Sequence, residues 1–215
     1  MCCDAGLGAR GNEACWDQEF TFARCCPAGG IAPKPLPPGV DPASVRGVPL
    51  LGGGSMPMSG LGLCCRPGAS GDPIRRAVLN YLLLGGRLLD GADLYGNHRE
   101  VGEGIRQAVA RGVPREEAFF VSKITPQDFG FESTVRWVEA TLKDLGHEYI
   151  DLVLLHWAEV PADGRACGNA KACRQETWLA LQRARRRGQI RHLGVSNFGA
   201  RQIEELQALG GAPVE

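Results

Sequence analysis

Short apolar runs alternate with helical patterns five times along this 215-residue chain. The apolar runs are residues 61–65, 88–90, 118–122, 150–155 and 190–195, and residues 212–215 are expected to begin a sixth. Strands that alternate with helices form a parallel sheet, because each helix carries the chain back to the edge where the next strand starts. The sequence therefore predicts an α/β fold with a parallel sheet.

One of these units, residues 88–106, carries candidate chemistry. Its apolar run stops at a carboxylate, Asp90, and Tyr95 follows five residues later. Asn97, with Glu100 three positions on, predicts an N-cap and a capping box. The next helix keeps its apolar residues on one face, and these are Val101, Ile105, Ala108 and Val109. Asp90 and Tyr95 are therefore expected where a strand passes into a helix, which is the catalytic rim in a barrel of strands and helices.

Local signals also predict several boundaries. Residues 50–60 predict a hairpin, and the last helix is expected over residues 201–209. Asp72, which precedes a proline, predicts a helix N-cap, and Gly146 predicts a C-cap. The nearly unbroken apolar run 150–155 is typical of a strand that is buried on both faces of a parallel sheet.

The first 45 residues differ in composition from the rest. Five of the nine cysteines fall within residues 1–26, and seven prolines lie between Pro27 and Pro49. Proline-rich stretches are typical of extended linkers. Residues 1–45 are therefore expected to form a disordered tail, and residues 46–215 a separate domain. Adjacent thiols in the tail could be palmitoylated, bind a metal or pair with each other, although no Cys-x-x-Cys spacing supports a zinc site.

The composition excludes some classes of protein. Lys plus Arg number 24, as do Asp plus Glu, so nothing indicates a nucleic-acid partner. No apolar run reaches the ~18–20 residues of a membrane helix, and the start lacks a signal-peptide pattern. A cytoplasmic protein with reduced cysteines is expected. Four cysteines of the domain are expected to be thiols without a role, and these are Cys64, Cys65, Cys167 and Cys173.

Three segments, in this order, resemble motifs of the aldo-keto reductase family. They are residues 90–97 followed by Val101-Gly102, residues 149–157 and residues 188–198. The resemblance covers about residues 48–215 and implies a TIM-type (β/α)8 barrel with a short N-terminal hairpin. A complete barrel takes about 250 residues, so only about five and a half of the eight βα units are expected here.

The resemblance also implies site residues at successive strand ends: Asp90, Tyr95, Lys123 and His156. In this family hydride passes from a nicotinamide to a carbonyl carbon, and the carbonyl oxygen is protonated. Tyr95 would be the general acid, because a phenol with an ordinary pKa near 10 still holds its proton at neutral pH. Lys123 would lower that pKa, Asp90 would hold Lys123, and His156 would orient the substrate oxygen.

Each of these residues alone also has a structural explanation. Asp90 could lead a helix, Tyr95 could pack in the core, Lys123 could be a surface charge and His156 a structural histidine. Their joint order at strand ends favours the catalytic interpretation. The other histidines lack such a context and are expected at the surface or at helix ends, and these are His98, His147 and His192.

The resemblance implies that Ser196 and Asn197, with Asp90, bind the cofactor. NADPH is expected and NADH is not excluded, because the family's segment that reads the 2′-phosphate does not occur up to Glu215. A small aldehyde or ketone is the expected partner, without nucleic acid or membrane. No metal site is predicted, and the patterns do not predict the oligomeric state.

Some positions depart from the family pattern. Gly91 stands where a small hydroxyl residue is usual, and His98 stands where an acid is usual. Ala158 follows Trp157, where proline is commoner. These departures are mild. The cysteine-rich tail and the missing units keep a second interpretation open, which is a non-catalytic binding or regulatory relative or the product of an incomplete gene model.

Overall fold

The computed structural model describes residues 46–64, 71–160 and 167–215. The predictions for residues 1–45, a disordered tail that includes most of the proline-rich linker, lie outside the described residues. Within the described ranges, no helix is both long and apolar enough to cross a lipid bilayer.

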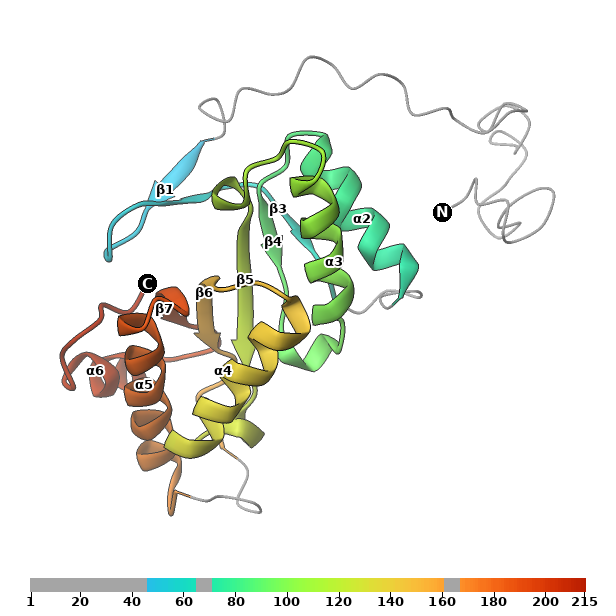
Figure 1. The fold of residues 1–215 in the computed structure, drawn as a ribbon. Helices are drawn as coiled ribbons and strands as arrows, with labels where there is room; N and C mark the ends of the chain where they lie inside the picture. Colours follow the sequence, from blue (N-terminus) through green and yellow to red (C-terminus); the bar gives the residue numbers. More distant parts are fainter. Residues whose placement is uncertain (1–45, 65–70, 161–166) are drawn as a thin grey trace, which may run out of the picture. The chain divides into compact units, whose positions relative to one another are not determined.

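A five-stranded parallel sheet forms the centre of the described fold and confirms the predicted α/β class (Figure 1). The strands lie side by side in chain order, and they are β3 (Gly60–Gly62), β4 (Leu88–Asp90), β5 (Phe119–Ile124), β6 (Ile150–Leu155) and β7 (Ile190–Val195). The bounds of β6 and β7 are those predicted. Because each strand adds to the same side of the one before it, right-handed connections place their helices on one face of the sheet.

Helices fill the connections between the strands (Figure 1). The described α-helices are α2 (Asp72–Leu83), α3 (His98–Val109), α4 (Phe131–Leu145), α5 (Ala170–Arg186) and α6 (Ala200–Gln207). Short 3₁₀ helices also occur, and they are η4 (Asp93–Tyr95), η5 (Arg115–Glu117) and η6 (Pro126–Asp128). Neighbouring α-helices contact each other in chain order from α2 to α6. This arrangement of strands and helices is one part of a (β/α)8 barrel.

The predicted hairpin is present, although it begins earlier than expected. Strands β1 (Gly47–Pro49) and β2 (Ser55–Pro57) pair in antiparallel register, with Val48 opposite Met56. The turn between them uses positive φ angles at Gly53 and Gly54, a conformation that glycine adopts without steric cost.

The apolar face of α3 packs where its period predicts. Val101, Ile105 and Ala108 are fully buried, whereas Val109 is exposed at the end of the helix. A glycine lets this helix approach α4 closely, because a Cβ atom on Gly102 would overlap the backbone carbonyl of Leu145. The helix is therefore held by side-chain burial on one face and by backbone proximity on another.

The predicted capping box of α3 is wrong in its contacts. Asn97 is the N-cap residue, but its side chain makes no capping hydrogen bond. Its Nδ2 atom instead donates to Leu63 O at 3.0 Å, and Glu100 Oε1 accepts from Gly71 N at 3.2 Å. Both side chains thus bind backbone groups of the connection after β3. Tertiary packing brings these groups close enough to replace the helix's own N–H groups as hydrogen-bond partners.

Three further predicted boundaries can be compared with the structure. The N-cap of α2 is Gly71, with φ 64°, and Asp72 is the first helical residue, where it pairs with Arg75. The C-cap of α4 is Gly146, in the left-handed conformation as predicted. Residues 212–215 are not a regular strand, but Glu215 N donates to Leu193 O at 3.0 Å, so they begin to pair alongside β7.

Candidate active site

The carboxyl ends of β4, β5 and β6 bring the predicted polar residues to one edge of the sheet. Asp90 is the last residue of β4, Lys123 lies near the end of β5, and His156 directly follows β6. The strand registers place Asp90 opposite Val121 and Lys123 opposite Leu154. In a parallel sheet these ends share one edge, so residues more than thirty positions apart in the sequence become neighbours.

Lys123 is the centre of this cluster. Its Nζ atom lies 2.6 Å from Asp90 Oδ1, 2.8 Å from Gly91 O and 3.4 Å from Tyr95 Oη. The side chain is only 9% exposed, whereas that of Asp90 is 45% exposed. A buried ammonium requires a charged partner and further hydrogen-bond acceptors, and these three oxygens supply both. Tyr95 comes to this position from η4, which directly follows the end of β4.

His156 faces Tyr95 across the cluster. Their ring centroids are 6.4 Å apart and the rings stand nearly perpendicular, at 81°. Burial and the nearby charge of Lys123 lower the pKa of His156, while Asp90 opposes this effect. The imidazole is therefore neutral at physiological pH. Its buried Nδ1 atom has no hydrogen-bond partner among the described residues, and Trp157 stacks on the ring with centroids 3.6 Å apart.

The turn after β7 brings the two predicted cofactor residues beside His156. Asn197 Nδ2 donates to His156 O at 2.8 Å and to Ser196 Oγ at 3.0 Å. Ser196 N donates to Leu155 O at 2.8 Å. Asn197 has a positive φ of 58°, a conformation that asparagine tolerates better than most residues. The structure thus places all six predicted site residues at the carboxyl ends of the strands or in the turns that follow.

Sequence reasoning missed a buried histidine next to this site. His98 was expected at the surface or at a helix end. It does begin α3, but it is only 7% exposed, and its Nε2 atom lies 2.9 Å from Ser122 Oγ. Burial lowers the pKa of His98 to about 4, although the charge of Asp144 acts in the opposite direction. Its spacing to Val101 and Ile105, three and seven residues, is that of one helix face and could have revealed its burial.

Of the other two histidines, His147 directly follows the C-cap of α4, at a helix end as predicted, whereas His192 lies within strand β7. Burial lowers the pKa of His147 to about 4, and the nearby charge of Arg115 adds to the effect. His192 stacks against Phe119 with ring centroids 6.3 Å apart, and its Nδ1 atom lies 3.5 Å from Glu215 Oε1. Both positions are decided by residues distant in the sequence.

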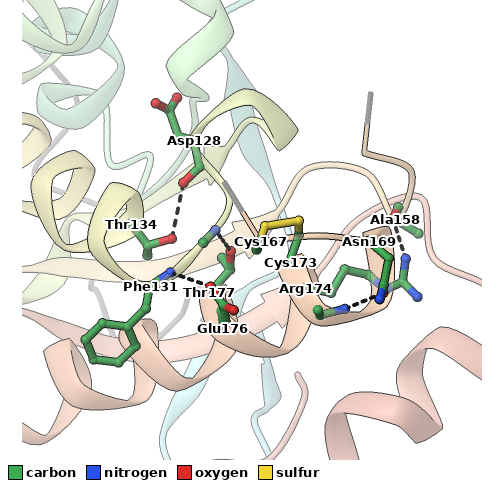
Figure 2. Close-up of a disulfide and its surroundings, with 12 residues drawn as sticks. Asp128, Phe131, Thr134, Ala158, Cys167, Asn169, Cys173, Arg174, Glu176 and Thr177 are labelled. Atoms are coloured by element: carbon green, nitrogen blue, oxygen red, sulfur yellow. Dashed lines mark hydrogen bonds between the residues drawn. A yellow bond between two sulfur atoms is a disulfide. The ribbon is translucent and has the colours of Figure 1, made fainter. Parts of the chain in front are cut away.

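Three cysteines that were expected to be thiols are disulfide-bonded instead, and they are Cys64, Cys167 and Cys173. The same expectation for Cys65 lies outside the described residues. Cys167 and Cys173 are joined, with their Cα atoms 5.0 Å apart (Figure 2). No group of three or more His, Cys, Asp or Glu side chains in the described ranges is arranged to hold a metal ion.

Comparisons with known proteins identify the family of this chain. The profile of the "Aldo/keto reductase family" matches residues 70–214. The "Uncharacterized oxidoreductase YtbE" of Bacillus subtilis (strain 168) is 37% identical over 155 residues, which cover 72% of this chain and 51% of that protein. The human "Aldo-keto reductase family 1 member A1" is 37% identical over 167 residues, covering 72% of this chain and 50% of that protein.

Solved structures lead to the same result. An aldo/keto reductase from Brucella melitensis superposes with a TM-score of 0.67 and 32% identity, over 80% of this chain and 60% of that one. A Bombyx mori aldo-keto reductase in complex with NADP has a TM-score of 0.67 and 32% identity, over 79% of this chain and 56% of that one. The chain spans about half the length of the curated relatives that it matches. Taken with the arrangement of strand ends, these matches establish that the chain belongs to the aldo/keto reductase family.

Proposed function

We propose that this chain carries the reacting groups of an NADPH-dependent reductase that converts a small aldehyde or ketone to an alcohol. The observation that supports this function is the position of Lys123 Nζ, 2.6 Å from Asp90 Oδ1 and 3.4 Å from Tyr95 Oη. An ammonium held by a carboxylate and pointed at a phenol is an arrangement that eases proton release from the phenol. The proposal places the reaction in the cytoplasm.

Tyr95 is the proposed general acid. As the carbonyl oxygen gains negative charge, the Tyr95 hydroxyl donates its proton to that oxygen. The phenolate that remains is stabilised by the charge of Lys123, and Asp90 keeps the lysine side chain in place. Positioned proton donors of this kind contribute about 10²–10⁴-fold to a rate.

His156 is the proposed orienting group for the substrate. Its imidazole is neutral, because burial and Lys123 lower its pKa, so a ring N–H can donate to the carbonyl oxygen without competing for the proton of Tyr95. The stack of Trp157 on His156 limits rotation of the ring. Since that tryptophan is 37% exposed, part of its surface is accessible to a substrate.

Ser196 and Asn197 fit a nicotinamide carboxamide by their chemistry. Ser196 Oγ accepts from Asn197 Nδ2, which leaves the serine hydroxyl hydrogen to donate to an amide oxygen. Asn197 Oδ1 is an acceptor for an amide N–H. When bound, a reduced nicotinamide would supply the hydride. The residues of this chain would orient it and protonate the product.

The test is the activity of the 215-residue chain and of matched tyrosine variants. We expect loss of reduced-nicotinamide absorbance with an aromatic aldehyde, and a decrease of about 10² or more in kcat for Tyr95→Phe. Tyr81→Phe is the control, because the Tyr81 hydroxyl donates to Ser59 O away from the cluster. Unchanged kcat in Tyr95→Phe would remove the proposed role of Tyr95.

The cofactor preference is tested separately by titrating the chain with NADPH and with NADH while following nicotinamide fluorescence. We expect NADPH to bind and binding to weaken in a Ser196→Ala, Asn197→Ala double variant. A chain that binds neither cofactor and reduces no carbonyl would favour a non-catalytic relative instead.

A further inference from the structure

The disulfide between Cys167 and Cys173 has no part in the proposed carbonyl reduction. The two residues are six positions apart and bridge the start of α5 (Figure 2). Cys173 lies in the first turn of α5 and is completely buried, whereas Cys167 keeps 8% of its surface exposed. The bond therefore needs an explanation of its own.

Hydrogen bonds hold the two cysteines close without the help of the bond. Asn169 N donates to Cys167 O at 2.8 Å, and Cys173 N donates to Asn169 O at 2.9 Å. The Asn169 side chain caps α5 by accepting from Ala172 N at 3.0 Å. None of these contacts uses a sulfur atom. The turn can therefore persist after reduction and keep the thiols near each other for oxidation.

The bond also constrains the unfolded chain less than a disulfide across a longer loop would. In the chain-entropy account, a disulfide stabilises a protein more when it closes a longer loop, and the separation here is only six residues. Longer-range contacts of α5 are made by other side chains. Arg174 donates to Ala158 O at 2.8 Å and Thr177 Oγ1 accepts from Gly130 N at 2.9 Å. We expect the domain to stay folded without the disulfide.

We propose that Cys167 and Cys173 form a reversible thiol–disulfide redox site whose reductant is a small thiol of the glutathione class. The bond is expected to be reversible because, in the cytoplasmic setting of the proposed function, disulfides that occur are usually transient or redox-sensing. The two cysteines would then be oxidised or reduced according to the ratio of reduced to oxidised small thiols around the protein. Its chemistry does not depend on carbonyl reduction, so either proposal can fail without the other.

The reduction proceeds by two thiol exchanges. The thiolate of one glutathione attacks Sγ of Cys167, the more exposed of the two residues, and the electron pair of the broken S–S bond leaves on Cys173 Sγ. The N–H groups of the first turn of α5 favour that thiolate, which then takes a proton from water. A second glutathione thiolate attacks the glutathione sulfur of the mixed disulfide. This step releases Cys167, which is protonated, and one glutathione disulfide, and reoxidation reverses both steps.

The site lies beside a contact that leads to the candidate active site. Arg174 follows Cys173 and holds Ala158 O, and Ala158 follows Trp157, which stacks on His156. The first turn of α5 thus binds Ala158 by a hydrogen bond and Cys167 by the disulfide. Reduction would remove the second attachment only. We expect faster hydrogen exchange at the Asn169 amide in the reduced protein, with the amides of β6 unchanged.

The main experiment equilibrates the full chain in buffers with different ratios of reduced to oxidised glutathione. Free thiols are then alkylated, and trypsin cuts after Arg165, Lys171 and Arg174. The peptides Ala166–Lys171 and Ala172–Arg174 stay linked only when the disulfide is present. We expect the fraction of linked peptides to fall as the ratio of reduced to oxidised glutathione rises. At each ratio the fraction should be the same whether the protein starts oxidised or reduced. A bond that persists at every ratio, or that never forms, would overturn the proposal.

Hydrogen exchange by mass spectrometry is the second measurement. Oxidised protein, reduced protein and a Cys167→Ser, Cys173→Ser double variant are compared. We expect the reduced protein and the variant to retain protection in β6 while the Asn169 amide exchanges faster than in the oxidised protein. If the variant fails to fold, the comparison of oxidised and reduced wild type still decides the question. Loss of protection throughout the sheet on reduction would mean that the bond is structural and would contradict the proposal.

Discussion

His98 Nε2 lies 2.9 Å from Ser122 Oγ in the buried layer between α3 and β5. His98 begins α3, three residues after Tyr95, and Ser122 directly precedes Lys123. The contact therefore joins α3, which follows the proposed acid Tyr95, to β5, which carries Lys123. Phe120 adds an edge-to-face contact with the His98 ring, with centroids 6.0 Å apart.

Ser122→Ala should destabilise the protein by about 1–3 kcal/mol, because it leaves a buried imidazole nitrogen without its hydrogen-bond partner. Urea denaturation followed by circular dichroism measures the change. Ser133→Ala is the matched control, since Ser133 Oγ makes only an exposed contact with Arg136, and about 0.5 kcal/mol or less is expected there. Equal effects of the two substitutions would contradict the buried contact.

Stability should fall as the pH is lowered from about 6.5 towards 4. The pKa of His98 is about 4 in the folded protein, below its ordinary 6.5, so in this window the unfolded chain binds a proton that the folded chain does not. The free energy of unfolding is then fully retained above pH 6.5 and lost progressively below it. One such histidine contributes at most about 3 kcal/mol.

This pH dependence is checked by denaturation of wild type and His98→Gln at several pH values. The variant lacks the titrating group and should lose less stability on acidification. His147 shifts in the same direction, so a residual slope is expected in the variant. Identical slopes in the two proteins would show that His98 is not the group responsible.

Lys123→Met should lower carbonyl reduction by about 10²-fold or more, because the phenolate of Tyr95 loses its stabilising charge. The rate is measured with NADPH and an aromatic aldehyde, and the fold is followed by circular dichroism. Lys143→Met is the control, since Lys143 is an exposed residue of α4. Retained activity in Lys123→Met would argue against the proposed role of Lys123.

Gly102→Ala should destabilise the protein by several kcal/mol, even though alanine favours a helix by about 1 kcal/mol. The new Cβ would overlap the carbonyl of Leu145, which is backbone and cannot move aside easily. Gly62→Ala is the control, because a Cβ there meets nothing within 4 Å. Thermal melting of both variants measures the difference, and a stable Gly102→Ala protein would contradict the close packing of α3 on α4.

The composition of residues 1–45 predicts that this segment is dispensable for the domain. Limited proteolysis should cut first between Pro27 and Arg46, and deletion of residues 1–45 should leave the melting temperature nearly unchanged. A large decrease on deletion would show that the segment stabilises the domain. Release of a bound metal on deletion would instead support a metal site among its cysteines.

Local patterns in the sequence were sufficient for the order of the strands and helices. The bounds of β6 and β7 follow from apolar runs, and the buried face of α3 follows from the helical period of Val101 and Ile105. The position of the candidate site could also be predicted from the sequence, because polar residues that end successive parallel strands must share one edge of the sheet.

Only the tertiary structure decided the partners of the remaining polar side chains. Asn97 binds the carbonyl of Leu63 rather than its own helix, and His98 binds Ser122 in the interior instead of facing water. Cys173 meets Cys167 because a turn capped by Asn169 folds one onto the other. Hydrogen bonds and disulfides form between groups that packing brings within about 3 Å. No period or composition of the sequence specifies which groups those will be.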